Sequence, residues 1–356
     1  MTRYVPPINI PSDLPVRRIF AYGLDEYPAL FKALGQPKFR AKQLAEWLYA
    51  NPVGSYEEMT NFSEDLRAKL ALVAPLQRAN VVECQTSTDG TRKYLIEFDD
   101  GEIVEAVGLP TKDRLTVCLS SQAGCAFGCT FCATGRAGFR RNLLPGEIAE
   151  QVRLVEQDFG RRVSNVVVMG QGEPFANYDA VLSGLRILNS EQGLNIGARH
   201  ITVSTSGLVE GIDRFAQEPE QFTLAVSLHS AIQGTRDALM PGLATQTLDK
   251  LFLALDNYYL ESGRRPSLEF ALIDGPQTED KEVSEIVRFA KRLGAHVNLI
   301  PINPITNGEA KPPSRARITQ IARAFEEAHV TATVRMERGG DIAAACGQLA
   351  NTYRKA

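Results

Sequence analysis

The sequence predicts an α/β fold: a partial (β/α)6 barrel preceded by a small N-terminal helical domain and a β-rich connector. From residue 114 onward, short apolar runs alternate with longer amphipathic segments. Near-continuous apolar strands between helices are typical of a parallel sheet covered by helices. The length of 356 residues suits a large α/β domain with an accessory part. We expect domains at 1–75, 76–110 and 111–345, and a separate C-terminal segment at 346–356.

The front of the chain, from about residue 20 to 74, has a helical pattern. Leu44, Trp47 and Leu48 recur at helical spacing, and Ser63 is a suitable N-cap for the segment that follows it. Three β-like runs come next, and the sequence DDG at Asp99–Gly101 is typical of a hairpin turn between the last two. The three runs are 80–86, 92–98 and 102–109.

The remaining sequence predicts seven apolar strands in about six βα units. The strands are 115–121, 165–170, 201–206, 222–229, 268–273, 296–303 and 331–337. The helices between them include 146–159, 248–260, 283–294 and 314–328. In a (β/α) barrel, functional residues gather at the C-terminal ends of the strands and in the loops that follow, so we expect the site there.

Composition limits the function classes. The formal net charge of −3 gives no reason by itself to expect nucleic-acid binding. No run of about eighteen apolar residues is present, and the N-terminus lacks the apolar core of a signal peptide. We therefore expect a cytoplasmic protein with no membrane association. In a reducing compartment, six cysteines favour metal binding or catalysis over a disulfide framework.

Three of these cysteines lie in one loop directly after the first barrel strand. Cys125, Cys129 and Cys132 have the spacing C-x3-C-x2-C. Thiolates are soft ligands that suit an iron–sulfur cluster or zinc. A structural zinc site would require a fourth ligand, and the neighbouring sequence has no histidine or second cysteine pair, although zinc stays an alternative. Three ligands on a four-iron cluster would leave one iron open.

This motif, with Phe131 before its last cysteine, resembles the radical S-adenosylmethionine (SAM) superfamily. The resemblance implies a 4Fe–4S cluster whose open iron binds SAM, so that one electron can cleave SAM to a 5′-deoxyadenosyl radical. The second strand ends in Gly170, Gly172 and Glu173, where the superfamily carries a glycine-rich motif for the methionine end of SAM. An ordinary βα turn is the alternative for this stretch taken alone.

Further stretches narrow the resemblance. They are SSQAGCAFGCTFCATG, FRRNLLPGEI, VMGQGEP, STSG, SLH, VNLIPINP and AACGQL, in this order. Together they resemble the RlmN/Cfr family of radical SAM RNA methyltransferases over essentially the whole chain. Gln171 departs from the methionine expected between the two glycines, and we expect it to face the site. By this match, the residues that contact SAM would be Gly172, Glu173, Ser204, Ser227, Leu228, His229 and Asn303.

The resemblance also implies the catalytic residues. Cys346, in AACGQL, matches the cysteine that one SAM molecule methylates, before a second SAM supplies the radical that activates this methyl group for transfer to C2 of adenosine. Cys118 matches the resolving thiol, which forms a transient disulfide with Cys346, and Glu105 matches the proton acceptor. From the residues alone, both thiols fit buried core cysteines, and Glu105 fits a solvent-facing strand position. Cys84 matches no role.

The partners implied are 23S rRNA, tRNA and an electron donor such as flavodoxin or ferredoxin, and we expect a monomer. Arg136, Arg140 and Arg141 around Phe139, and the basic stretch 38–42, are candidate RNA contacts, although such clusters are often ordinary surface. Two alternatives stay open. One is Cfr-like methylation of adenosine at C8, and the other is a non-catalytic RNA-binding protein with a structural metal held by cysteines.

Overall fold

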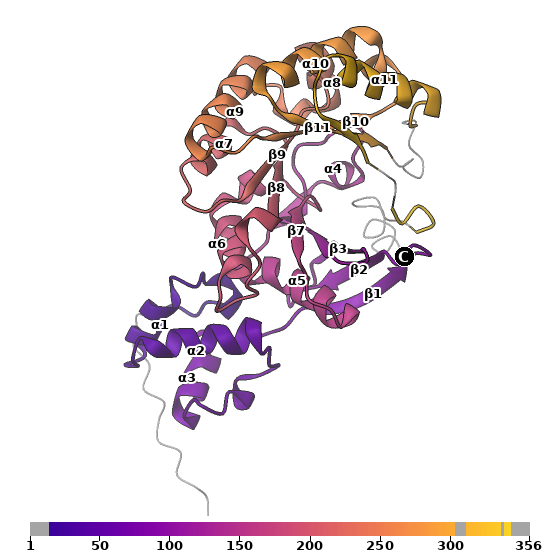
Figure 1. The fold of residues 1–356 in the computed structure, drawn as a ribbon. Helices are drawn as coiled ribbons and strands as arrows, with labels where there is room; N and C mark the ends of the chain where they lie inside the picture. The colour runs from indigo at the N-terminus through magenta and orange to yellow at the C-terminus, as the bar shows by residue number, and fades with distance from the viewer. Residues whose placement is uncertain (1–13, 303–310, 336–337, 343–356) are drawn as a thin grey trace, which may run out of the picture.

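The computed structural model describes residues 14–302, 311–335 and 338–342. Its centre is a ten-stranded sheet in the order β1-β2-β3-β4-β7-β8-β9-β10-β11-β12. Neighbouring strands are antiparallel from β1 to β4 and parallel from β4 to β12. The predicted α/β fold with an incomplete barrel is therefore confirmed, and the strands of the connector continue the barrel sheet (Figure 1).

The strands of the large sheet are β1 Asn80–Thr86, β2 Arg92–Glu97, β3 Ile103–Pro110, β4 Leu115–Leu119, β7 Asn165–Val168, β8 Ile201–Thr205, β9 Thr223–Ser227, β10 Ser267–Leu272, β11 His296–Pro301 and β12 Ala332–Val334. A separate hairpin is formed by β5 Gln122–Gly124 and β6 Phe139–Asn142. All seven predicted barrel strands are present, although several end earlier than their apolar runs suggest, because their last residues turn into the βα loops.

The helices of the barrel region are α4 Ala133–Ala137, α5 Pro145–Phe159, α6 Tyr178–Asn189, α7 Val209–Ala216, α8 Gln233–Leu239, α9 Leu248–Ser262, α10 Asp280–Leu293 and α11 Arg315–Glu327. Short helical turns are η4 Pro174–Asn177, η5 Ala198–His200, η6 Pro241–Leu243 and η7 Pro276–Thr278. Figure 1 shows the larger helices α7, α9, α10 and α11 following the outer side of the curved sheet. None of the helices in the described ranges combines the length and the apolar character needed to cross a bilayer.

The two faces of the barrel strands differ in burial. In β4, Leu115, Val117 and Leu119 are buried on the side where α5 packs, whereas Thr116 and Cys118 are partly exposed. The same alternation recurs in β8. Side chains alternate across a strand, so the small and polar residues line the inner face of the barrel. The sequence predicted near-continuous apolar strands. β9 and β10 are buried at most positions, whereas the inner faces of β4, β7 and β8 are only half-buried.

The front domain consists of short helices: η1 Ile19–Ala21, α1 Tyr27–Ala33, α2 Phe39–Ala45, the π-helical turn η2 Glu46–Ala50, η3 Tyr56–Glu58 and α3 Glu64–Val73. Leu44 and Leu48 are fully buried, as their spacing predicts, and Trp47 packs beside them. The predicted cap is also confirmed, since the Ser63 hydroxyl accepts a hydrogen bond from the amide of Leu66 at 3.3 Å. Figure 1 shows this domain at one end of the molecule, away from α9–α11.

Residues 338–342 connect the two edges of the large sheet. They follow β12, the last strand in the order, and hydrogen-bond to the turn after β1, the first strand. The amide of Thr88 donates to Asp341 at 2.9 Å, and the amide of Gly339 donates to Asp89 at 3.1 Å. Arg338 adds a hydrogen bond to the carbonyl oxygen of Pro110, the last residue of β3, at 3.0 Å. Residues that follow the last strand of the sheet are therefore anchored at its opposite edge.

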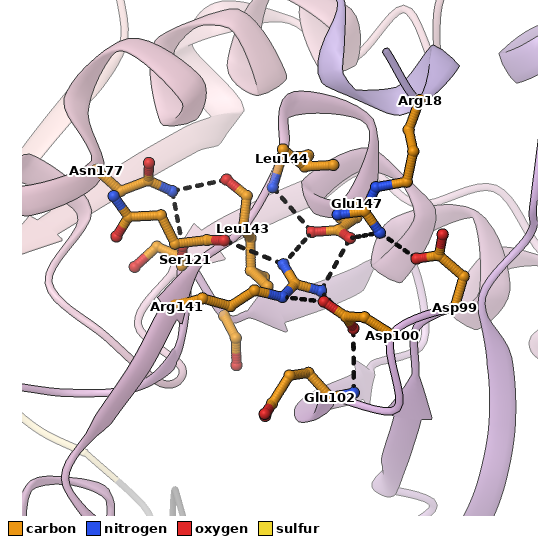
Figure 2. A network of polar contacts seen from close by, with 12 residues as sticks. Arg18, Asp99, Asp100, Glu102, Ser121, Arg141, Leu143, Leu144, Glu147 and Asn177 are labelled. Carbon is orange, nitrogen blue, oxygen red and sulfur yellow. Dashed lines mark hydrogen bonds and ion pairs between the residues drawn. The ribbon is translucent and has the colours of Figure 1, made fainter. Parts of the chain in front are cut away.

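A polar network joins the front segment, the β2–β3 turn and the start of α5 (Figure 2). Its centre is Glu147, a buried carboxylate that accepts two hydrogen bonds from Arg141, at 2.7 and 3.0 Å. Arg141 also binds Asp100 in the β2–β3 turn at 3.0 Å, and Arg18 of the front segment binds Asp99. Bidentate guanidinium–carboxylate pairs are geometrically specific, so this network fixes β6 against the β2–β3 turn.

Candidate active site

The three-cysteine loop runs between β5 and α4, at the carboxyl-terminal end of β4. Cys125, Cys129 and Cys132 are all half-buried. The loop starts at Gly124, whose φ is +77° and where an added Cβ would lie 2.0 Å from the carbonyl oxygen of Gly138. The amide of Cys125 donates to that same oxygen at 3.0 Å. Glycine at 124 therefore lets the two ends of the loop meet.

The environment of these thiols suits a metal-bound state. Burial raises the pKa of Cys125 to about 11, with the charge of Cys132 adding to the effect. Burial likewise raises the pKa of Cys129 to about 12, with the charges of Cys132 and Cys125 adding to it. Thiolates crowded in this way need cationic ligation, which iron supplies. Within the described ranges, no three His, Cys, Asp or Glu side chains converge on a single-ion site. Each cysteine of a 4Fe–4S cluster binds a different iron, so the donor set fits such a cluster.

A second segment, α8 with η6, supports the cluster loop from outside. The amide of Thr130 donates to the carbonyl oxygen of Leu239 at 3.0 Å, and the amide of Gly242 donates to that of Phe127 at 3.1 Å. An added Cβ at Gly242 would lie 2.6 Å from this Phe127 oxygen, so glycine is required by the close approach. These contacts join two stretches more than one hundred residues apart in sequence.

The predicted glycine-rich stretch after β7 packs directly on β5. Gly172 has a φ of +97°, and an added Cβ would lie 2.5 Å from the Cβ of Gln122. The neighbouring Gln171 is buried, and its backbone carbonyl accepts from the amide of Ser121 at 2.8 Å. The Gln171 side-chain oxygen is buried and has no hydrogen-bond partner among the described residues. The stretch is therefore more than an ordinary turn, since it holds the base of the cluster loop.

Replacing Gly172 with alanine is expected to destabilise the protein by about 2–4 kcal/mol, because a clash with Gln122 adds to the strain of a positive φ. Gly101 is the matched control, since it has a φ of +79° but no atom within 4 Å of an added Cβ. Gly101→Ala should therefore lower the free energy of unfolding only through the strain of a positive φ, by about 1 kcal/mol. Urea unfolding of both variants measures the difference, and equal losses would contradict the packing assigned to Gly172.

Glu173 connects the ends of β7 and β8. Its buried carboxylate accepts from Thr205 Oγ1 at 2.7 Å and Phe175 N at 3.0 Å on one oxygen, and from the amide of Ser206 at 2.6 Å and its hydroxyl at 2.5 Å on the other. Burial raises the pKa of Glu173, and these hydrogen bonds oppose the increase. The four donors occupy the four acceptor positions of the carboxylate. Glu173 thus has a structural role here, and its contact with SAM stays a prediction.

The other predicted SAM contacts in the described ranges lie at the ends of β8 and β9. Ser204 and Ser227 are half-buried on the inner face of the sheet. Leu228 is fully buried, and its amide donates to the carbonyl oxygen of Glu269 at 3.1 Å. Both serine hydroxyls thus face the same interior as Cys118, as a cofactor bound over these strand ends would require.

His229 has a defined protonation state. Burial, together with the charge of Arg236, lowers the pKa of His229 to about 3, so the ring is neutral at physiological pH. Its Nδ1 accepts from the amide of Ala271 at 3.1 Å, which assigns the ring proton to Nε2. The edge of Phe131, in the cluster loop, packs against the ring at a centroid distance of 4.9 Å. His229 therefore presents a neutral N–H donor beside the cluster loop.

Glu105 is not a solvent-facing residue. It lies in β3 with 3% of its side chain exposed, and its carboxylate pairs with Lys93 of β2 at 3.0 Å. Lys93 is 0% exposed, so this is a buried ion pair. The register places Val107 opposite both Lys93 and Cys118, and residues opposite each other share a face of the sheet. Glu105, Lys93 and Cys118 therefore all lie on the inner face of the barrel.

The structure limits which arginines can contact RNA. Arg141 belongs to the network of Figure 2, and Arg140 pairs with Glu102 at 2.8 Å. Arg136 donates to the carbonyl oxygen of Thr130 at 2.9 Å, within the cluster loop. These contacts help to hold the cluster loop and β6 in place, but Arg136, Phe139 and Arg140 are exposed, so their contact with RNA stays a prediction. Cys346 and Asn303 lie outside the described residues.

Sequence reasoning missed two charged residues at this site, Lys93 and Arg236. Both are 0% exposed, and neither belongs to a motif. For Lys93 a signal existed, because a lysine within the apolar run RKYLIE is unusual and implies a buried acidic partner. Arg236 lies in the polar stretch QGTRDAL, which reads as surface helix, so the sequence carried no comparable signal.

Comparisons with known proteins cover both the front domain and the barrel. The model of the ribosomal RNA large subunit methyltransferase N-terminal domain matches residues 21–76, and that of the radical SAM superfamily matches residues 119–289. The chain is 45% identical over 323 residues to a probable dual-specificity RNA methyltransferase RlmN of Synechococcus elongatus, covering 89% of each. It is 43% identical over 348 residues to the protein of the same name in Halalkalibacterium halodurans, covering 97% of this chain and 95% of that one.

A solved structure shows the same architecture. The radical SAM methyltransferase from Sphaerobacter thermophilus superposes with a TM-score of 0.87 at 43% identity, covering 94% of this chain and 99% of that one. The front-domain match, the superfamily match and these relatives together span nearly the whole sequence. The chain therefore belongs to the RlmN family of the radical SAM superfamily.

Proposed function

We propose that this enzyme methylates C2 of a specific adenosine in 23S ribosomal RNA and in tRNA, with Cys346 as the methyl carrier. Its relatives carry the name of dual-specificity RNA methyltransferases. As a radical SAM enzyme it uses a 4Fe–4S cluster and SAM. When bound, they supply a methyl group and a 5′-deoxyadenosyl radical. Work on these RNAs would locate the enzyme in the cytoplasm.

The observation that carries this proposal is the anchoring of residues 338–342, which follow the last strand, on the turn after β1 and the end of β3. Cys346 is four residues beyond Ile342, and four extended residues span at most about 14 Å. Cys118 lies on the inner face of the barrel, on the strand that follows β3 in the sheet. Arg338 is bonded to Pro110, which pairs with Leu115 at the start of the strand that bears Cys118. This anchoring on the neighbouring strand supports the proposal that Cys346 meets Cys118.

Each chain residue then has one task. Cys125, Cys129 and Cys132 would hold the cluster, and two SAM molecules would be used in each turnover. The Cys346 thiolate would accept a methyl group, an easy displacement for sulfur. After the methylene carbon on the Cys346 sulfur has bonded to the adenine ring, Glu105 would take the ring proton, and one electron would leave the adduct and return to the cluster that supplied it. The Cys118 thiolate would then attack the Cys346 sulfur, forming a Cys118–Cys346 disulfide and breaking the bond between that sulfur and the methylene carbon. That carbon would take up a proton to become the methyl group, and the disulfide would be reduced before the next turnover.

Lys93 would position Glu105 for this reaction, and the residues at the strand ends would bind SAM. Lys93 holds the Glu105 carboxylate at the inner face through the 3.0 Å ion pair. SAM would lie over Gly172, Glu173, Ser204, Ser227, Leu228 and His229, with Asn303 as a further contact. The neutral His229 ring offers one N–H donor to it. Cys84, exposed on β1, has no part in the proposal.

The RNA would be held mainly by the front domain, residues 1–75. Its helix α2 exposes the side chain of Phe39, beside Lys38 and Lys42. An exposed aromatic ring between cations suits stacking on a base and contact with phosphate. The target adenosine would have to leave its stack to reach the barrel interior. We propose a monomer that takes electrons from a flavodoxin or ferredoxin.

Nucleoside analysis of ribosomal and transfer RNA, from cells with and without the gene, tests this function. We expect 2-methyladenosine to be missing from both RNA pools of the deleted strain and restored by the wild-type protein. Loss from one pool alone would restrict the substrate. Loss of 8-methyladenosine instead would contradict C2 specificity and favour the Cfr-like reaction, which the same cysteines could perform.

A further inference from the structure

Helix α8 carries an arginine that is fully buried and incompletely bonded. Arg236 is 0% exposed, and its Nη2 donates to the carbonyl oxygen of Ser206 at 2.6 Å. Its Nε and Nη1 are buried and have no hydrogen-bond partner among the described residues. No carboxylate within the described ranges forms an ion pair with it. A buried guanidinium with two donor nitrogens unpaired is unusual and requires an explanation.

The surroundings of Arg236 locate it beside the cluster loop. Its Nη2 lies 2.9 Å from the Cβ position of Gly207, just after β8, and its charge acts on His229, just after β9. Burial lowers the pKa of Arg236, and the charges of Asp237 and Cys129 oppose this. Three residues further on, the carbonyl oxygen of Leu239 accepts the hydrogen bond from Thr130. The guanidinium thus lies between two strand ends and the loop that bears the three cysteines.

The described part of the chain supplies no counter-charge for the Arg236 guanidinium, and a buried charge without one is energetically costly. Arginine remains protonated in proteins, so neutralisation is not an escape from burial. A buried charge without a partner is strongly destabilising, which is why buried charges are paired or bind ions. Asp237, the next residue in the helix, accepts a hydrogen bond from Gln233 at 2.7 Å through its Oδ1 and is not among the hydrogen-bond partners found for Arg236 in the described ranges. The anion must therefore come from outside the described chain.

We propose that Arg236 is the counter-cation of the iron–sulfur cluster held by Cys125, Cys129 and Cys132. Three thiolates outweigh the positive charge of an oxidised 4Fe–4S core, and one-electron reduction adds a further negative charge. A buried guanidinium beside the cluster stabilises the reduced state more than the oxidised state. Arg236 therefore raises the reduction potential and makes the cluster easier to reduce. This inference rests on the proposed function, because it requires the cluster at these cysteines.

The test compares Arg236→Met and Arg236→Gln with wild type, and Arg186→Met is the matched control. Arg186 lies on the outer helix α6 and pairs with Glu218 and Glu220, so its loss removes one positive charge away from the cluster. Each protein is prepared without iron and then reconstituted anaerobically. Two quantities are measured: the midpoint potential by titration followed with electron paramagnetic resonance, and the melting temperature before and after cluster loading.

For both Arg236 variants we expect a midpoint potential more negative than that of wild type. The melting temperature of the cluster-free protein should stay at or above the wild-type value, because an unpaired buried charge has been removed. Cluster loading should then raise the melting temperature of the variants less than that of wild type. The rate at which the cluster is lost to a chelator should be about 10-fold higher in the variants. Arg186→Met should match wild type in the potential and in the gain on loading.

Four results would overturn the inference. An unchanged potential together with weaker SAM binding would assign Arg236 to the carboxylate of SAM. Cluster-free variants that melt well below wild type, or do not fold, would show that the chain itself needs Arg236. Wild type that forms no iron–sulfur chromophore would overturn the cluster assignment and this inference together. A wild-type cluster with unaltered properties in both variants would overturn the inference alone.

Discussion

Replacement of Cys118 with alanine is expected to leave RNA covalently attached to the protein through Cys346. In the proposed reaction the carbon bonded to the Cys346 sulfur also bonds to the adenine ring, and release requires a second thiol to attack that sulfur. Cys118 lies on the inner face of the barrel and is the thiol proposed for this attack. Without it the adduct should accumulate at up to one RNA per protein. Denaturing electrophoresis, followed by mass spectrometry of the nuclease-treated adduct, would locate the attachment.

The matched controls separate the two thiols. Cys346→Ala should give neither adduct nor product, because no carrier is present. The double variant Cys118→Ala/Cys346→Ala should also give neither adduct nor product. Cys84→Ala should methylate RNA at the wild-type rate, because Cys84 is exposed on the edge strand β1. Normal methylation by both Cys118→Ala and Cys346→Ala would show that methyl transfer does not pass through a cysteine in this enzyme.

Replacement of Lys93 with methionine is expected to have the largest effect on stability, a loss of about 3–5 kcal/mol. The change would leave the Glu105 carboxylate uncompensated at a site where 3% of its side chain is exposed. The variant should also lose RNA methylation, because the ion pair would no longer hold the Glu105 carboxylate in place at the inner face. Urea denaturation gives the loss of stability, and product analysis under reconstituted conditions gives the loss of activity.

Two comparisons test whether the cost arises from the lone carboxylate. Lys93→Met/Glu105→Gln should recover most of the lost stability, since replacing both partners of a buried pair is far less costly than removing one. It should not recover activity. Lys42→Met removes an exposed partner of Glu46 at 3.9 Å, and should cost no more than about 0.5 kcal/mol. A double variant as unstable as Lys93→Met would contradict the assigned cause.

The sequence alone was sufficient for features that depend on local patterns. Short apolar runs that alternate with longer amphipathic segments predicted the βα units, and the Ser63 cap and the Asp99–Gly101 turn followed from local chemistry. The position of Cys125, Cys129 and Cys132 after the first barrel strand followed from spacing within one loop. Such features depend on residues close in sequence, so their signals survive without a structure. The ends of the strands were predicted less accurately, because several strands end earlier than their apolar runs do.

The partners of the charged residues were decided only by the tertiary structure. Glu105 is held by Lys93 because β2 and β3 pair in one register, and Arg141 serves a network because Glu147 and Asp100 meet there. Arg236 lies beside the cysteine loop because α8 packs on it, more than one hundred residues further along the chain. A charge in a sequence does not reveal whether water or a counter-charge will surround it. That outcome depends on which distant segments exclude water together, and folding alone brings those segments into contact.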